Sequence, residues 1–186
     1  NFMPTAAYIK PHLKGATMIA LCSPLNPSWT MFSKKDLEDI CDLILKENES
    51  RGAHEKPLYL LYDQIYALLT FGTNKHYNPV TLRPEIKPYT VYIDGTSKCF
   101  AATGVRVGWG FGPDNIISKM RAILAHIGAW APKAEQMATA KFLTQKDDLN
   151  TYLNSFKRKI RTSLDALYKG ILELKSAEFK VDAIST

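Results

Sequence analysis

The chain has 186 residues, of which 46% are hydrophobic and 23% are charged. This length and composition allow one domain with a sizeable buried core, and they exclude a chain that is disordered throughout. The balance of 24 Lys and Arg against 18 Asp and Glu gives a formal net charge of +6. The densest basic run, residues 157–161, lies in a helical pattern. We interpret it as a solvated helix face, with contact to phosphate or nucleic acid as the alternative.

The cysteines and histidines disfavour two kinds of site. The three cysteines are widely spaced and odd in number, which suggests no disulfide framework and favours a reducing compartment. The four histidines show no metal-ligand spacing. No apolar run reaches transmembrane length, and no signal peptide opens the chain. We expect a soluble, cytoplasmic protein with no metal site, no membrane partner and no nucleic-acid partner.

The first half of the chain combines short apolar runs with one helical pattern. Residues 18–22 form an apolar run that ends at Ser-Pro, and we expect a buried strand there. Residues 33–36 resemble a capping box, and the helix that they begin should end near Gly52. Residues 58–62 form a second apolar run, which is too short for a helix. A loop rich in Pro, Gly and Asn should follow over residues 72–88.

The second half begins with strands and continues with helices. We expect a third strand over residues 90–93 and a fourth over 105–109. Pro113-Asp114 should begin a helix, and longer helical patterns cover residues 132–146 and 147–177. The order strand, helix, strand, irregular crossover, strand predicts an α/β fold. Its sheet should be mostly parallel, with at least three parallel strands and flanking helices.

Polar residues follow each of the first three expected strands. Asn26-Pro27 follows the first, Asp63 the second, and Asp94-Gly-Thr-Ser-Lys98 the third. Ligands of parallel sheets bind beyond the carboxyl ends of the strands. The pattern therefore predicts one pocket that receives an amide, a carboxylate and a lysine. Polar turns are common at strand ends, so solvated turn residues are the alternative reading.

The strings around these residues resemble class I/II aminotransferases of the aspartate aminotransferase type, a family of fold type I enzymes that depend on pyridoxal phosphate. Residues 94–113 resemble the family's lysine segment, in which an arginine follows the lysine by eight positions, as Arg106 follows Lys98. Residues 58–66 resemble its strand that ends in Asp-x-x-Tyr, and residues 23–28 resemble its Asn-Pro-Thr/Ser turn. The motifs occur in family order, and the resemblance covers nearly the whole chain.

The resemblance implies a role for each of five residues. Lys98 would be catalytic: it would hold pyridoxal 5'-phosphate in a Schiff base and, once freed, move a proton. Asp63 would pair with the pyridinium nitrogen of the cofactor and keep it protonated. Asn26 and Tyr66 would bind the ring phenolate, and Tyr66 is counted with the catalytic residues. Arg106, with its planar fork, would bind the cofactor phosphate.

Two positions depart from the family pattern. The family turn usually continues Asn-Pro-Thr-Gly, whereas Ser28-Trp29 stands here, so a large side chain replaces a permissive glycine. Many members carry a serine three residues before the lysine, where this chain has Gly95. One hydroxyl contact to the phosphate is then absent, and Thr96 or Ser97 are the candidates to replace it.

The resemblance also implies that the chain is an internal fragment of a longer protein. Residues 1–146 would belong to the cofactor-binding large domain, and residues 147–186 would form a connecting helix and the start of the small domain. The family's phosphate-binding loop would precede this segment, and the arginine that binds the substrate carboxylate would follow it. We therefore expect the isolated segment to be inactive and the intact protein to be a homodimer.

The main functional hypothesis is an aminotransferase that moves an amino group between an amino acid, aspartate or a similar one, and a 2-oxo acid. One alternative is another enzyme with the same cofactor core, such as a C–S lyase. A non-catalytic binding or regulatory domain on the same scaffold is an alternative of a different class. A nucleotide-binding domain that uses residues 108–112 is a third, although this string lacks the G-x-G-x-x-G spacing.

Overall fold

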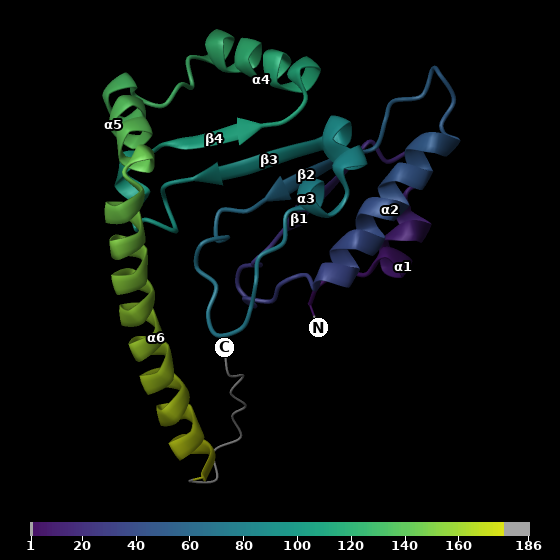
Figure 1. Ribbon diagram of the computed structural model, residues 1–186. Coiled ribbons are helices and arrows are strands. Elements are labelled where there is room, and N and C mark those ends of the chain that lie inside the picture. The colour runs from purple at the N-terminus through teal and green to yellow at the C-terminus, as the bar shows by residue number, and fades with distance from the viewer. Residues whose placement is uncertain (1, 177–186) are drawn as a thin grey trace.

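A four-stranded sheet forms the centre of the computed structural model, which describes residues 2–176 (Figure 1). Its strands are β1 (Met18–Cys22), β2 (Tyr59–Asp63), β3 (Thr90–Gly95) and β4 (Gly108–Phe111), side by side in that order. The first three strands are parallel, and β4 runs antiparallel to β3. The prediction of an α/β fold with a mostly parallel sheet and flanking helices is confirmed.

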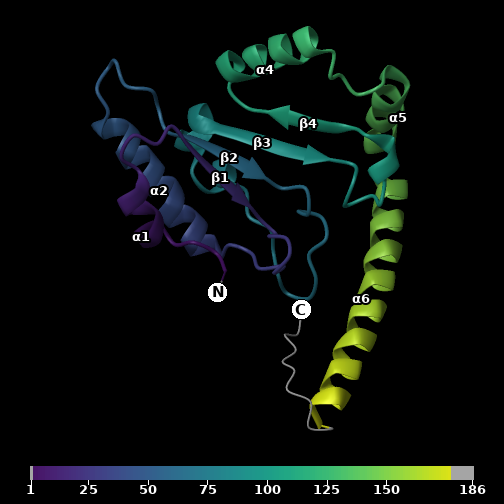
Figure 2. The ribbon, with the colours of Figure 1, turned by 180° about the vertical axis from the view of Figure 1, so that it is seen from behind.

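One face of the sheet is covered by the helices of the first half, α1 (Ala6–Ile9), η1 (Lys10–His12) and α2 (Lys34–Ser50) (Figures 1 and 2). The helix α2 begins where the capping pattern predicts, because the Ser33 hydroxyl accepts a hydrogen bond from the Asp36 N–H at 3.1 Å. Its apolar side chains recur at helical spacing and are fully buried against the sheet. The core includes Leu37, Ile40, Cys41 and Ile44 of α2 together with Leu21, Leu60 and Tyr62 of the strands.

The crossover from β2 to β3 is more ordered than the sequence predicts. It contains the short helix α3 (Pro79–Leu82) and the 3-10 helix η2 (Pro84–Tyr89), where we expected a loop. The Asn78 side chain caps α3 by accepting a hydrogen bond from the Thr81 N–H at 3.2 Å, and a proline suits the first turn. The Pro and Asn residues that we interpreted as signs of a loop instead lie at the beginnings of these helices.

The predicted fourth strand, residues 105–109, begins three positions and ends two positions earlier than β4. Residues Thr103–Val105 form the 3-10 helix η3, and Arg106 has a left-handed backbone with φ 59°. The alternation of Val and Arg in this string suggested a strand, but a left-handed residue interrupts an extended chain. Pairing with β3 begins only at Gly108, which is opposite Gly95.

Three helices complete the described chain: α4 (Asp114–Ile127), α5 (Lys133–Thr144) and α6 (Lys146–Ser176). They confirm the three helical patterns of the second half, except for the predicted end at residue 177, which lies outside the described residues. The helix α4 lies on the sheet face opposite α2, where a Cβ added at Gly110 would be 3.4 Å from the Met120 methyl. The helix α6 extends from the carboxyl ends of β1–β3 away from the sheet (Figure 2).

The basic run of residues 157–161 belongs to α6. Arg158 and Lys159 are exposed, and Arg161 forms an ion pair with Asp165 one turn later, at 2.9 Å. Within residues 2–176, no helix combines the length and the apolar character that crossing a membrane requires.

The sheet face toward α4 is only partly covered. Met18 of β1 is 57% exposed, and on α4 the neighbouring side chains Ile123 and Ile127 are 59% and 67% exposed. Exposed apolar surface and open strand edges favour association. We therefore predict that residues 1–186, expressed alone, self-associate, and that Ile123→Lys with Ile127→Lys reduces the association. Sedimentation velocity measures both, and a monomeric segment at micromolar concentration would contradict the prediction.

Candidate functional site

The carboxyl ends of β1, β2 and β3 bring three of the predicted residues together. Asn26 lies in the turn after β1, and its side-chain N–H donates to the Tyr66 hydroxyl at 3.4 Å. The Lys98 ammonium nitrogen lies over the Tyr66 ring, 6.0 Å from its centre. Tyr66 therefore contacts residues that stand 40 and 32 positions away in the sequence. Tyr66, which follows β2, thus joins the turn after β1 to the segment after β3. Among the described residues, no hydrogen bond or ion pair joins Asp63 to Asn26 or Lys98, so the predicted convergence of amide, carboxylate and lysine stays a prediction for Asp63.

Asp63 is the last residue of β2 and is paired in register with Cys22 on β1. One carboxylate oxygen accepts a hydrogen bond from the Ile65 N–H at 3.0 Å, which orients the side chain. The other oxygen has no hydrogen-bond partner among the described residues. Burial and the nearby charge of Asp63 raise the pKa of the Cys22 thiol. Asp63 thus lies at the predicted edge of the sheet with one acceptor oxygen available.

The residues on both sides of Lys98 are fixed to the protein interior. Thr96 is buried, and both its N–H and its hydroxyl donate to the Val107 carbonyl at 3.1 Å. The Cys99 thiol is buried, donates to the Ile65 carbonyl, and has its pKa raised to about 11 by burial. Cys99 is therefore a packed residue, as predicted. Because the Thr96 hydroxyl is hydrogen-bonded to Val107, Ser97 is the remaining candidate to replace the missing hydroxyl contact to the phosphate. The Lys98 side chain itself is exposed and lies between the buried residues Thr96 and Cys99.

Arg106 is not in contact with the other predicted site residues. It is exposed, and one guanidinium N–H donates to the Thr103 carbonyl at 3.0 Å. It shares with Lys98 the loop between β3 and β4, whose ends are held together by the bonds from Thr96 to Val107. Arg106 lines a cavity with Trp109 of β4 and with residues of α4 and α5, and most of its N–H donors make no hydrogen bond to the described residues.

Backbone strain is concentrated in the loops around this site. Three non-glycine residues have positive φ in the described part of the chain: Trp29 at 56°, Ala101 at 50° and Arg106 at 59°. A side chain in the left-handed region costs on the order of 1–3 kcal/mol, and such strain persists where surrounding contacts enforce it. Trp29 lies in the turn after β1, and the other two lie in the loop of Lys98. Strained residues of this kind are enriched at functional sites.

Trp29 is the residue at this site that the motifs did not assign. Its indole packs edge-on against the Tyr66 ring, with ring centres 5.0 Å apart. The only signal in the sequence was negative, namely the tryptophan that stands where the family turn has glycine. In the structure the turn is nevertheless closed, by hydrogen bonds between residue 25 and residues 29 and 30.

Gly95 cannot be replaced by the family's serine without a shift of the backbone. A Cβ at this position would lie 3.0 Å from the Gly108 Cα and 3.1 Å from the Val107 carbonyl oxygen. Backbone atoms cannot rotate away as a flexible side chain can. We predict that Gly95→Ser lowers the free energy of unfolding by about 1–3 kcal/mol, as overpacking does.

Gly104→Ser is the matched control for this substitution. A Cβ at Gly104 meets no atom within 4 Å, so this variant should unfold at nearly the same denaturant concentration as the parent protein. Chemical denaturation measures the free energy of unfolding of both variants. Equal stability of the two serine variants would show that the close approach of β4 does not destabilise a side chain at position 95.

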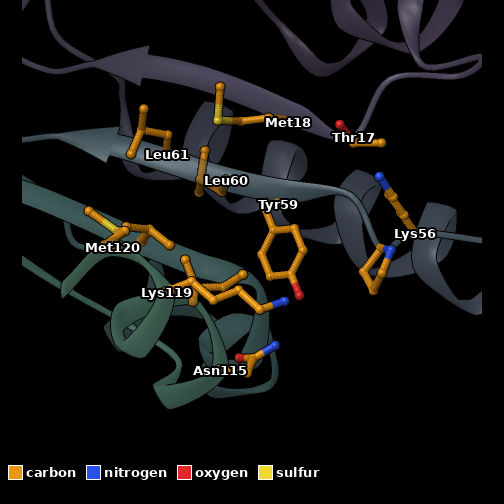
Figure 3. A pocket seen from close by; sticks show the side chains of 12 residues that line it. Thr17, Met18, Lys56, Tyr59, Leu60, Leu61, Asn115, Lys119 and Met120 are labelled. Carbon is orange, nitrogen blue, oxygen red and sulfur yellow. The ribbon is translucent and has the colours of Figure 1, made fainter. Parts of the chain in front are cut away.

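A cavity lies between the sheet and α4, away from the candidate site. It has a volume of about 550 Å³ and is lined by Met18, Tyr59 and Leu61 of the sheet and by Lys119 and Met120 of α4. Figure 3 shows the Tyr59 ring pointing toward Lys119. These residues lie near the amino ends of the strands, so the cavity contains none of the predicted site residues.

Comparison with known proteins gives a consistent result. A family model described as "Aminotransferase class I and II" matches residues 5–182. An aspartate aminotransferase of Bacillus sp. (strain YM-2) is 26% identical over 164 residues, which are 87% of this chain and 40% of the relative. A kynurenine–oxoglutarate transaminase of Dictyostelium discoideum is 30% identical over 159 residues, which are 84% of this chain and 35% of the relative.

A solved structure shows the same fold. The aspartate aminotransferase from Thermus thermophilus with maleate matches with a TM-score of 0.83 and 23% sequence identity. The match covers 94% of this chain and 42% of that chain. This chain therefore spans less than half the length of each of these three proteins.

Proposed function

Because this chain belongs to the class I and II aminotransferase family, we propose that the full-length protein transfers an amino group between an amino acid and a 2-oxo acid, with pyridoxal 5'-phosphate bound covalently to Lys98. The observation that carries the proposal is the contact of Asn26, Tyr66 and Lys98 beyond the ends of the parallel strands. Aspartate or a similar amino acid is the proposed substrate, since aspartate aminotransferases are among the relatives.

The side chains at the strand ends fit this cofactor chemically. Pyridoxal 5'-phosphate presents an aldehyde, a phenolate, a ring nitrogen and a phosphate. The site offers an amine on Lys98, N–H and O–H donors on Asn26 and Tyr66, a free carboxylate oxygen on Asp63 and a guanidinium on Arg106. Each group of the cofactor thus has a side chain of complementary chemistry.

Each of these side chains has a proposed task. Asn26 donates to the oxygen of Tyr66, so the Tyr66 O–H hydrogen stays available to a third group, the phenolate. Asp63, oriented by Ile65, holds a proton at the ring nitrogen through its free oxygen. The Lys98 amine would hold the cofactor covalently and, when free, would move a proton from the substrate α-carbon. When bound, the cofactor supplies a ring that takes up the electron pair left on that carbon.

Reduction with borohydride tests the proposal directly. Treatment of the full-length protein, loaded with pyridoxal 5'-phosphate, should trap the covalent link to lysine. Peptide mapping should then find the pyridoxyl group on Lys98. A label on another lysine, or no label at all, would reject the assignment.

Arg106 is proposed to bind the cofactor phosphate. We predict that Arg106→Ala weakens binding of pyridoxal 5'-phosphate by roughly 1.5–3 kcal/mol, the range for the loss of a hydrogen bond to a charged group. Arg106→Lys should lie between this variant and the parent protein, because it keeps the charge but loses the two-pronged geometry. Absorbance titration of the apoprotein measures the dissociation constants. An unchanged value in the alanine variant would exclude Arg106 from the phosphate site.

The remaining proposals concern the whole protein. We propose that residues 1–146 belong to the cofactor-binding domain and that residues 147–186 begin the small domain. We also propose that the full-length protein is a homodimer and that the present segment alone has no activity. The support for inactivity is that the segment spans only 40% and 35% of two related enzymes. Transamination assays on the segment and on the full-length protein would measure the difference.

A further inference from the structure

The turn that follows β1 holds Trp29 in one place. The Trp29 N–H donates to the Leu25 carbonyl at 2.6 Å, and the Leu25 N–H donates to the Thr30 carbonyl at 2.9 Å. The hydroxyls of Ser28 and Thr30 are hydrogen-bonded to each other at 2.8 Å. These bonds close a tight turn in which residue 29 has φ 56°. The backbone here would suit a glycine, so the preference of the turn does not explain the presence of an indole.

Tyr66, by contrast, is weakly held at its hydroxyl end. Its one hydroxyl contact among the described residues is the 3.4 Å bond from Asn26, which is long for a hydrogen bond and exposed to solvent. Lys98, at 6.0 Å from the ring centre, is at the outer limit of a cation–π contact. The tight edge-on contact with Trp29 is thus the closest ring contact that fixes the orientation of the Tyr66 ring.

We propose that Trp29 is a positioning residue, which acts through Tyr66. Its indole, fixed by the closed turn, holds the Tyr66 ring so that the hydroxyl stays near Asn26 and the ring face stays below Lys98. A glycine at this position would leave the same backbone but provide no surface for the ring. This inference rests on the proposed function, because the position of the Tyr66 hydroxyl matters only if that hydroxyl binds the cofactor.

The test measures the dissociation constant of pyridoxal 5'-phosphate for variants of the full-length apoprotein. Trp29→Gly is the informative change, because glycine adopts the left-handed backbone freely and should leave the turn intact. It should raise the dissociation constant about 3- to 10-fold, as expected for the loss of one aromatic pair. Trp29→Phe should recover most of the affinity, since a phenyl ring can supply the same edge contact.

A double-mutant cycle separates positioning from general stability. If Trp29 acts through the Tyr66 hydroxyl, then Trp29→Gly should have little further effect in a Tyr66→Phe background, within about twofold of Tyr66→Phe alone. The control is Tyr89→Leu, which removes an edge-on ring pair with Tyr59 at the opposite ends of the strands. This control should change thermal stability but leave the dissociation constant within about twofold.

The outcomes distinguish failure of the positioning role of Trp29 from failure of the proposed function. An unchanged dissociation constant in Trp29→Gly, or losses that multiply in the double variant, would overturn the positioning role and leave the proposed function standing. An equal loss in the Tyr89→Leu control would also overturn it, since the effect would then reflect stability alone. A parent protein that forms no covalent link at Lys98 would reject the proposed function and this role together.

Discussion

Lys98→Ala should abolish the covalent link to pyridoxal 5'-phosphate and reduce kcat by about 10²- to 10⁴-fold in the full-length protein. The substitution removes both the nucleophilic amine and the group that moves the proton. The Lys98 side chain is exposed and forms no ion pair within the described residues, so its loss should change the free energy of unfolding little. Absorbance spectra of the loaded protein and steady-state kinetics measure the two effects.

Lys35→Ala is the matched control for this experiment. Lys35 lies on α2, is exposed, and forms a one-turn ion pair with Asp39 at 2.9 Å. Exposed pairs of this kind contribute little to stability, so this variant should keep the activity and the spectrum of the parent protein. Turnover of Lys98→Ala within tenfold of the parent rate would show that another residue moves the proton.

Asp63→Asn should lower kcat by about 10²- to 10³-fold while the cofactor stays bound, the scale for removing one preorganised electrostatic group. An amide cannot hold a proton at the ring nitrogen as a carboxylate does. The asparagine oxygen can still accept the hydrogen bond from the Ile65 N–H, so the turn after β2 should be retained. The loss should therefore appear in single-turnover rates and not in the dissociation constant of the cofactor.

The carboxylate on the next strand provides the control for Asp63→Asn. Asp94 accepts from the Gly95 N–H with one oxygen and from the Gln64 amide with the other, and burial raises its pKa. Both oxygens are thus used within the fold, and Asp94→Asn should reduce kcat by less than about tenfold. Comparable losses of kcat in the two asparagine variants would show that Asp63 is no more important for turnover than Asp94.

The elements with a strong local pattern were predictable from the sequence. The apolar runs gave β1, β2 and β3 within one or two residues, and the Ser33 cap and its periodic apolar residues gave α2. Local patterns failed where a few backbone torsions decide the outcome. Arg106 looks like a strand residue, but its left-handed torsion delays β4 until Gly108. Residues 79–89 look like a loop, but Asn78 caps a helix there.

By itself, the sequence determined the residue types of the site and the order in which they occur. An amide, a carboxylate and a lysine that each follow a buried strand must meet when those strands are parallel, since parallel strands end at one edge. The tertiary structure alone decided three further points. A Cβ at Gly95 would force the backbone to shift, because the Gly108 Cα would lie 3.0 Å from it; the Thr96 hydroxyl is hydrogen-bonded to the Val107 carbonyl; and Trp29 packs against Tyr66. Each depends on atoms brought together from distant parts of the chain, and no local pattern encodes such a distance.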